Sequence, residues 1–237
     1  MMRIVLLLLL LLAAPAPAQE DYEKANTAYS KGRFSEAAEL YRKLEAEGYR
    51  DAELYYNLGN AYFELKDLGR ARAGYERARQ LAPRDADLAH NLALLRTELR
   101  DNEPDPGALV RLAALFTENE LVFVSSLFYF LAAGLALAYS RRRNEGFLWG
   151  VAAALVCLLF VGGLLLCQKL GQPGRPAVVI PQTVHLKNGP GREFTDSIPL
   201  HAGTLVQALR QQGDWREVAA LERVKGWIRS EELDVLD

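Results

Sequence analysis

The sequence predicts a multidomain protein with an all-α repeat domain, a two-helix transmembrane hairpin and a small all-β domain, in that order. Three observations predict this fold class. Residue types recur 34 positions apart in the first half of the chain, two uncharged apolar runs follow one another closely, and short β-prone runs fill the C-terminal part. The average composition, 50% hydrophobic and 24% charged with a net charge of -2, conceals these differences because it mixes unlike segments.

The N-terminus has the order of a secretory signal peptide. Arg3 precedes an apolar core of about a dozen residues, and the small-residue sequence Ala16-Pro17-Ala18 follows it. The apolar core is shorter than the ~20 residues that a membrane-spanning helix needs. We therefore expect a signal peptide over residues 1–18, cleaved before Gln19, and the alternative is an uncleaved anchor.

Two segments of the N-terminal half align with each other at a constant spacing. Residues Ala25–Leu44 (ANTAYSKGRFSEAAELYRKL) and Gly59–Ala78 (GNAYFELKDLGRARAGYERA) share residue types at positions 34 apart. The matched pairs are Asn26 and Asn60, Tyr29 and Phe63, Phe34 and Leu68, Ala37 and Ala71, Tyr41 and Tyr75, and Leu44 and Ala78. A unit of this length with two helices and these residue types is the tetratricopeptide repeat. We expect the alanines to let the helices approach closely and the aromatic side chains to fill the space between repeats.

The same register predicts an all-α tetratricopeptide repeat solenoid. Gly32 offers the turn between the helices of the first repeat, and Pro83 ends the second repeat. Asn57 recurs as Asn91, which indicates a third first-helix that caps the stack. The expected bounds are repeats at about 21–50 and 52–85 and a capping helix at 86–100, within a domain over residues 19–100.

Residues 101–120 predict a linker and an interfacial helix. Asp101–Gly107 is polar and contains prolines, which break helices. The residues that follow carry apolar side chains on one helical face, as a helix lying in the membrane interface does. The alternative is a simple helical extension of the membrane span that follows.

Two uncharged apolar runs have the length that a helix needs to cross a bilayer. Between them lie Arg141, Arg142 and Arg143, and short loops rich in arginine stay on the cytoplasmic side. We therefore expect both folded domains on the periplasmic side of the bacterial inner membrane. Neither run contains an ionisable residue other than tyrosine and cysteine, which argues against a transporter or proton pathway. The expected bounds are transmembrane helices at 121–140 and 147–167, with a cytoplasmic loop at 141–146.

The C-terminal part changes to short β-prone runs after a linker at residues 168–175. About five strands fit into residues 176–237, which predicts a small barrel or sandwich. The segments VHLKNGP, AGTLVQAL, GDWREV and KGWI resemble the successive elements of bacterial SH3-like (SH3b) domains. The resemblance implies a small all-β SH3-like barrel with Trp215 and Trp227 packed in its core. A ligand platform is the alternative role for these tryptophans.

No catalytic or metal-binding constellation is visible in the sequence. His90, His185 and His201 have no second histidine and no cysteine at metal-ligand spacing. Phosphate-binding glycine loops and nucleophile motifs are absent. The net charge is near neutral and the arginine triplet is the one basic cluster, which argues against a nucleic-acid partner. The sequence therefore predicts a protein without cofactor or enzymatic activity that works by binding.

The repeat register also predicts a concave groove lined by the first helix of each repeat. Asparagine offers both donors and an acceptor, so it can hold an extended peptide backbone. Some tetratricopeptide domains hold a chain-end carboxylate with two asparagines plus lysines and an arginine. Asn26 and Asn57 match those asparagines, but the cationic positions hold Tyr22, Asp87 and Asn91, so we expect no carboxylate clamp. The alternative role of the asparagines is hydrogen bonding on the helix surface or between helices. The candidate peptide-binding residues are Tyr22, Asn26, Asn57, Asn60 and Asn91.

The complete arrangement resembles BatE-type proteins of bacterial aerotolerance operons over essentially the whole chain. The resemblance implies work beside von Willebrand factor A-domain membrane proteins and a MoxR-type AAA ATPase. We therefore expect a membrane-anchored extracytoplasmic scaffold that binds protein partners through its groove, within an aerotolerance or envelope-stress complex. The alternative function is peptidoglycan binding through the SH3b domain. In both cases the lipid bilayer is a partner.

Overall fold

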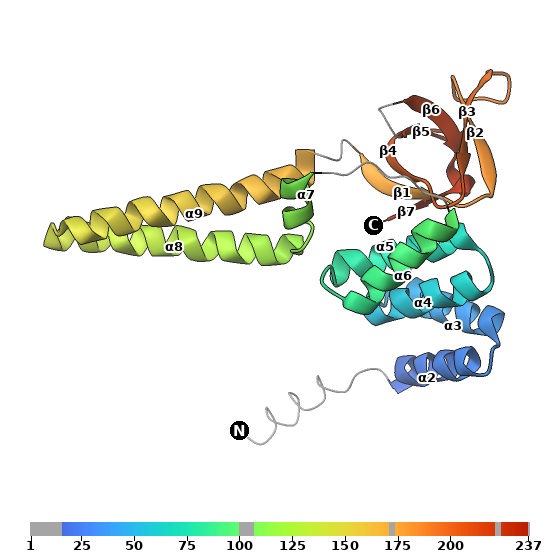
Figure 1. Ribbon diagram of the computed structural model, residues 1–237, viewed down its shortest axis with the longest axis horizontal. Coiled ribbons are helices and arrows are strands. Elements are labelled where there is room, and N and C mark those ends of the chain that lie inside the picture. The colour runs from blue at the N-terminus through green and yellow to red at the C-terminus, as the bar shows by residue number, and fades with distance from the viewer. Residues whose placement is uncertain (1–15, 100–106, 171–173, 221–223, 237) are drawn as a thin grey trace, which may run out of the picture.

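The computed structural model describes residues 16–99, 107–170, 174–220 and 224–236. Figure 1 shows a stack of short helices, a long helical hairpin that projects away from it, and a curved β-sheet beside the stack. Most of the expected signal peptide lies outside the described residues. Its expected cleavage point, before Gln19, falls within the first described helix, α2 (Ala16–Ser30).

Five helices form the stack, and their order follows the 34-residue period. They are α2 (Ala16–Ser30), α3 (Phe34–Ala46), α4 (Ala52–Glu64), α5 (Leu68–Leu81) and α6 (Ala86–Leu99). Asp51 and Asp67 begin α4 and α5, because each carboxylate accepts a hydrogen bond from a free backbone N–H of the first turn. Gly32 and Lys66, which are 34 residues apart, both have positive φ in the turns between paired helices. Glycine adopts this conformation without strain, whereas the second repeat places a lysine in it.

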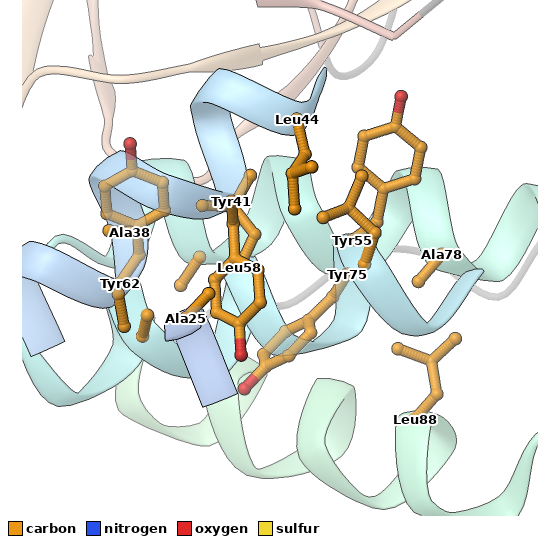
Figure 2. Packing of buried hydrophobic residues seen from close by; sticks show 14 of the residues in the cluster. Ala25, Ala38, Tyr41, Leu44, Tyr55, Leu58, Tyr62, Tyr75, Ala78 and Leu88 are labelled. Atoms are coloured by element: carbon orange, nitrogen blue, oxygen red, sulfur yellow. The ribbon is translucent and has the colours of Figure 1, made fainter. Parts of the chain in front are cut away.

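Small residues allow the close helix contacts of the stack. A Cβ atom on Gly74 would lie 2.9 Å from the Cα of Gly59, and one on Gly59 would lie 2.5 Å from the ring of Tyr75. Ala37 and Ala71 are fully buried. The tyrosines at the repeated position are buried as well, and Figure 2 shows Tyr41 and Tyr75 among the packed alanines and leucines. Both expectations for the repeat helices, close approach at small residues and aromatic filling, are therefore confirmed.

A short helix precedes the hairpin and is separate from it. α7 (Ala108–Ala113) is followed by a turn, and Thr117 then caps α8 (Glu118–Arg142) in a reciprocal box with Glu120. Gln168, near the end of α9 (Glu145–Leu170), donates hydrogen bonds to the carbonyls of Ala113 and Phe116. The alternative of a simple helical extension is therefore wrong, because the cap interrupts the helix.

Helices α8 and α9 pack antiparallel as a hairpin. Both are long and apolar enough to cross a membrane. Only Arg143 and Asn144 separate them, because the helices extend into the loop expected at residues 141–146. Arg143 ends α8 in the left-handed conformation, and its N–H donates to the carbonyl of Tyr139.

The C-terminal part is a seven-stranded antiparallel sheet in the order β3-β2-β6-β5-β4-β1-β7. The sheet confirms the expected all-β class, with seven strands instead of about five. Trp227 is 6% exposed and contributes to its core, as expected. Trp215 is only half buried and lies under the guanidinium of Arg229, because it begins a strand beside a turn. The strands are β1 (Arg175–Val179), β2 (Thr183–Lys187), β3 (Asp196–His201), β4 (Leu205–Gln212), β5 (Trp215–Ala219), β6 (Lys225–Arg229) and β7 (Leu233–Val235).

The sheet is docked on the outer face of α5 through β1 and β7. Ala73 of α5 packs in one buried cluster with Val178 and Leu236. A Cβ atom on Gly69 would lie 2.6 Å from the carbonyl oxygen of Ile180, so helix and strand touch at backbone level. Arg77 donates to both carboxylate oxygens of Asp234 and to the carbonyl of Val235, the last at 3.0 Å. We call these contacts the α5–sheet junction.

Candidate peptide-binding groove

The first helix of each unit presents one face to a common concave surface. α2, α4 and α6 are offset by 34 residues, so equivalent positions lie side by side. The central part of this surface is a hollow of about 280 Å³. Residues of all three helices and one side chain of α5 line it: Tyr29, Tyr56, Asn60, Phe63, Glu64, Tyr75, Asn91 and Leu94.

Tyrosine and asparagine side chains form a repeated hydrogen-bond ladder beneath the groove. Within each repeat, a hydroxyl of the second helix donates to an asparagine of the first: Tyr41 to Asn26 Oδ1 at 2.5 Å, and Tyr75 to Asn60 Oδ1 at 2.7 Å. Between units, an asparagine Nδ2 donates back to a tyrosine hydroxyl: Asn57 to Tyr22 at 2.9 Å, and Asn91 to Tyr56 at 3.0 Å. Both contacts recur with the sequence period, so the ladder is a direct product of the repeat.

The ladder leaves alternating donors and acceptors on the groove surface. Asn60 Oδ1 also accepts from Asn91 Nδ2 at 2.9 Å, so the Oδ1 of Asn60 and the Nδ2 of Asn91 are engaged. An asparagine amide has two donor hydrogens and two acceptor lone pairs. Within the part of the chain that the structure describes, the Nδ2 groups of Asn26 and Asn60 and the Oδ1 atoms of Asn57 and Asn91 keep unused capacity. An extended peptide backbone presents the complementary alternation of C=O and N–H groups.

Burial keeps the ladder hydroxyls protonated above pH 10, the ordinary pKa of a phenol. It raises the pKa of Tyr41 to about 12, and it raises the pKa values of Tyr22 and Tyr75 above the ordinary value for a phenol as well. The pKa of Tyr29 is raised by burial first and then by the negative charge of Glu64. The carboxylate of Glu64 is thus close enough to act on the aromatic wall of the hollow.

Of the five residues expected in the groove, Asn60 and Asn91 line the hollow, and Tyr22, Asn26 and Asn57 belong to the ladder; all five are half buried. The structure also supplies the alternative role for the asparagines, since each one bonds a tyrosine of the neighbouring helix. The two roles coexist because each amide group uses only part of its capacity in the ladder. The apolar and acidic walls were not anticipated, although the 34-residue register applied to Tyr22 and Asn60 places Tyr56 and Leu94 on the same surface. The missed residues of the hollow are Tyr29, Tyr56, Phe63, Glu64, Tyr75 and Leu94.

The opposite side of the second repeat is covered by the C-terminal sheet, because α5 carries the α5–sheet junction there. Its neighbour Glu76 is buried and accepts from Arg72 and Arg79, each at 2.7 Å. Burial acts to raise the pKa of Glu76, but Arg79 and Arg72 together hold it below its ordinary value. This carboxylate is therefore a structural anion within α5 and takes no part in the groove.

Among the described residues, no group of three or more histidine, cysteine, aspartate or glutamate side chains could hold a metal ion.

Comparison with protein families finds a matching model, described as tetratricopeptide repeat, over residues 22–86. No curated protein matches the chain. The matched segment covers α3, α4, α5 and most of α2, which contain the whole ladder except for Asn91. Residues 22–86 therefore consist of tetratricopeptide repeats, a non-enzymatic protein-interaction module.

Proposed function

We propose that the protein is a membrane-anchored scaffold that holds an extended segment of a partner protein in the groove of α2, α4 and α6. The observation that carries this proposal is the set of unused amide groups above the tyrosine–asparagine ladder. They offer both donors and acceptors, and the aromatic residues of the hollow offer apolar contact to side chains. The ladder fixes the amides before a peptide binds, so few side chains of the protein lose conformational freedom on binding.

The membrane anchor is the hairpin of α8 and α9. Arg141 and Arg142 lie in the last turn of α8, and Arg143 follows directly, so three positive charges mark the tip. The positive-inside tendency favours a cytoplasmic tip. Both the repeat helices and the sheet connect to the other end of the hairpin, which supports the placement of both on the periplasmic side of the inner membrane.

The repeat stack is held near the base of this hairpin. Arg84 donates to a carboxylate oxygen of Glu120 at 2.5 Å and lies over the ring of Phe116. The exposed apolar side chains of α7, such as Leu109, suit contact with the membrane interface. The groove is therefore suited to partners that are themselves in or beside the membrane, such as the von Willebrand factor A-domain proteins of a BatE-type complex. The C-terminal sheet, as an SH3-like barrel, braces the stack from its outer side.

Site-specific photocrosslinking in native membranes tests the proposal. A photoreactive amino acid at Leu94, which is 48% exposed in the hollow, is compared with one at Glu39, an exposed position on α3. We expect a discrete membrane-protein adduct from Leu94 alone, and weaker adduct formation when Asn60→Ala and Asn91→Ala remove amide groups. Equal adducts from both positions, or an adduct insensitive to the double substitution, would contradict the proposal.

A further inference from the structure

The concave surface has a one-sided charge pattern. Its positions on α4 are Tyr56, Asn60, Phe63 and Glu64, which line the hollow, together with Glu53 and Asn57. The equivalent positions on α2 and α6 lie 34 residues away. Every charged residue at these positions is acidic, and none is a lysine or an arginine. The acidic residues are Glu23, Glu53, Glu64, Asp87 and Glu98.

Most of this negative charge is not neutralised by the fold. Glu98 has one ion pair, with Lys66 at 3.6 Å, and both side chains are largely exposed. Within the described residues, Glu23, Glu53, Glu64 and Asp87 form no ion pair. Two exposed lysines of α2 and α3 pair with acids outside this set instead. Lys24 pairs with Glu20 and Asp21, and Lys43 pairs with Asp21 at 2.5 Å. Parallel carboxylates along a groove produce a field that favours a cationic ligand.

Glu64 is the carboxylate best placed to receive such a ligand. It lines the hollow together with Tyr29, Tyr56 and Phe63. Its charge raises the pKa of Tyr29, after the larger effect of burial. A lysine or arginine side chain can lay its methylene stem on aromatic rings and place its charge on a carboxylate.

We propose that the groove selects a cationic segment of its partner, with a lysine or arginine seated between Glu64 and the ring of Tyr29. This inference rests on the proposed function, since it specifies the chemistry of the segment held by the ladder amides. The backbone of the segment bonds to Asn60 and Asn91, and further basic side chains face the acids at either end of the groove. An acidic segment meets repulsion along the whole surface.

Fluorescence anisotropy with three matched peptides tests the inference. The peptides are of about ten residues, ~33 Å when extended, with the same leucines and alanines and with lysine, glutamine or glutamate at the remaining positions. The full chain is held in phosphatidylcholine nanodiscs, and empty nanodiscs provide the background. We expect the order lysine, glutamine, glutamate in affinity, with the lysine peptide losing its advantage as the salt concentration rises from about 50 to 500 mM.

Two substitutions assign the effect to the groove. Glu64→Gln is expected to weaken the lysine peptide about two- to five-fold, the range for a partly exposed ion pair, while leaving the glutamine peptide unchanged. Glu39→Gln, an exposed glutamate on α3, is the matched control and is expected to change neither. Equal affinity for the lysine and glutamine peptides, or equal losses in the two variants, overturns the inference.

The outcomes also separate this inference from the proposed function. Binding of all three peptides with similar affinity, together with the Leu94 adduct, overturns charge selection and leaves the scaffold function standing. Failure of every peptide to bind, together with equal adducts from Leu94 and Glu39, overturns both.

Discussion

Replacing Arg77 with alanine removes the charged part of the α5–sheet junction and leaves its apolar part in place. Arg77 donates three hydrogen bonds, two to the carboxylate of Asp234 and one to the carbonyl of Val235. The Arg77 side chain is 14% exposed and that of Asp234 is 30% exposed. A hydrogen bond to a charged group contributes about 1.5–3 kcal/mol when buried, and partial exposure screens the pair. We therefore expect a loss of about 2 kcal/mol, or roughly 30-fold in the opening equilibrium of the junction.

Hydrogen exchange of the full chain measures this change locally. The amide of Leu236, which donates to the carbonyl of Pro176 between β7 and β1, reports on the junction. Its exchange should accelerate by roughly the factor of 30, while amides of α2 should keep their rates. Arg70→Ala on the same helix is the control, because this guanidinium is about half exposed and pairs with Asp67 in its own turn. We expect at most about a five-fold effect there.

Two results would refute the reasoning about the junction. Unchanged exchange at Leu236 in Arg77→Ala would mean that the apolar cluster alone holds the sheet. Uniform acceleration through α2 and α4 would mean that the substitution unfolds the repeats instead of opening the junction.

Three further predictions concern the repeat stack. Gly74→Ala should lower the melting temperature of the helical signal in circular dichroism, because the added Cβ meets backbone atoms of Gly59 that cannot move aside. The expected cost is about 1–3 kcal/mol. Gly134→Ala is the control and should leave the melting temperature unchanged, because its Cβ meets nothing within 4 Å. Because the folded-state pKa of Tyr41 is raised to about 12, its contribution to stability should be complete below the unfolded value near 10 and lost as pH rises through 12. A loss already complete at pH 9 in denaturant titrations would contradict this assignment. A peptide with acidic side chains and a free C-terminal carboxylate should show no salt-sensitive binding in fluorescence anisotropy, since the groove lacks the cations of a carboxylate clamp.

The sequence period identified equivalent positions on the first helices but not their contacts. A spacing of 34 residues identifies Asn60 and Asn91 as equivalents of Asn26 and Asn57, because the repeat is a local and regular pattern. The hydrogen bonds of these asparagines cross to other helices, over separations of 15 and 35 residues, and so need the packed stack to be defined. The separation of α7 from α8 was within reach of the sequence, since Thr117-Glu118-Asn119-Glu120 has the pattern of a capping box.

The α5–sheet junction had no comparable signal. Arg77 and Asp234 are separated by 157 residues, and nothing periodic connects a tetratricopeptide helix with a β-strand. Arg72 and Glu76 on the adjoining part of α5 are almost fully buried in the structure. Charged residues are seldom fully buried unless they are paired. A helix that reads as amphipathic in isolation therefore gives no warning that both of its faces are covered.

The junction also accounts for how so short a stack keeps its groove in shape. Repeat proteins gain stability from the interfaces between neighbouring units, and two repeats with a capping helix have few of them. The sheet adds an interface to α5, whose inner side supplies Tyr75 to the ladder under Asn60. The contact of the sheet with the outer side of α5 thus helps to fix the Tyr75 hydroxyl, which orients the amide of Asn60. Under the proposed function, the C-terminal domain acts on peptide binding without touching the peptide, through the helix that it shares with the groove.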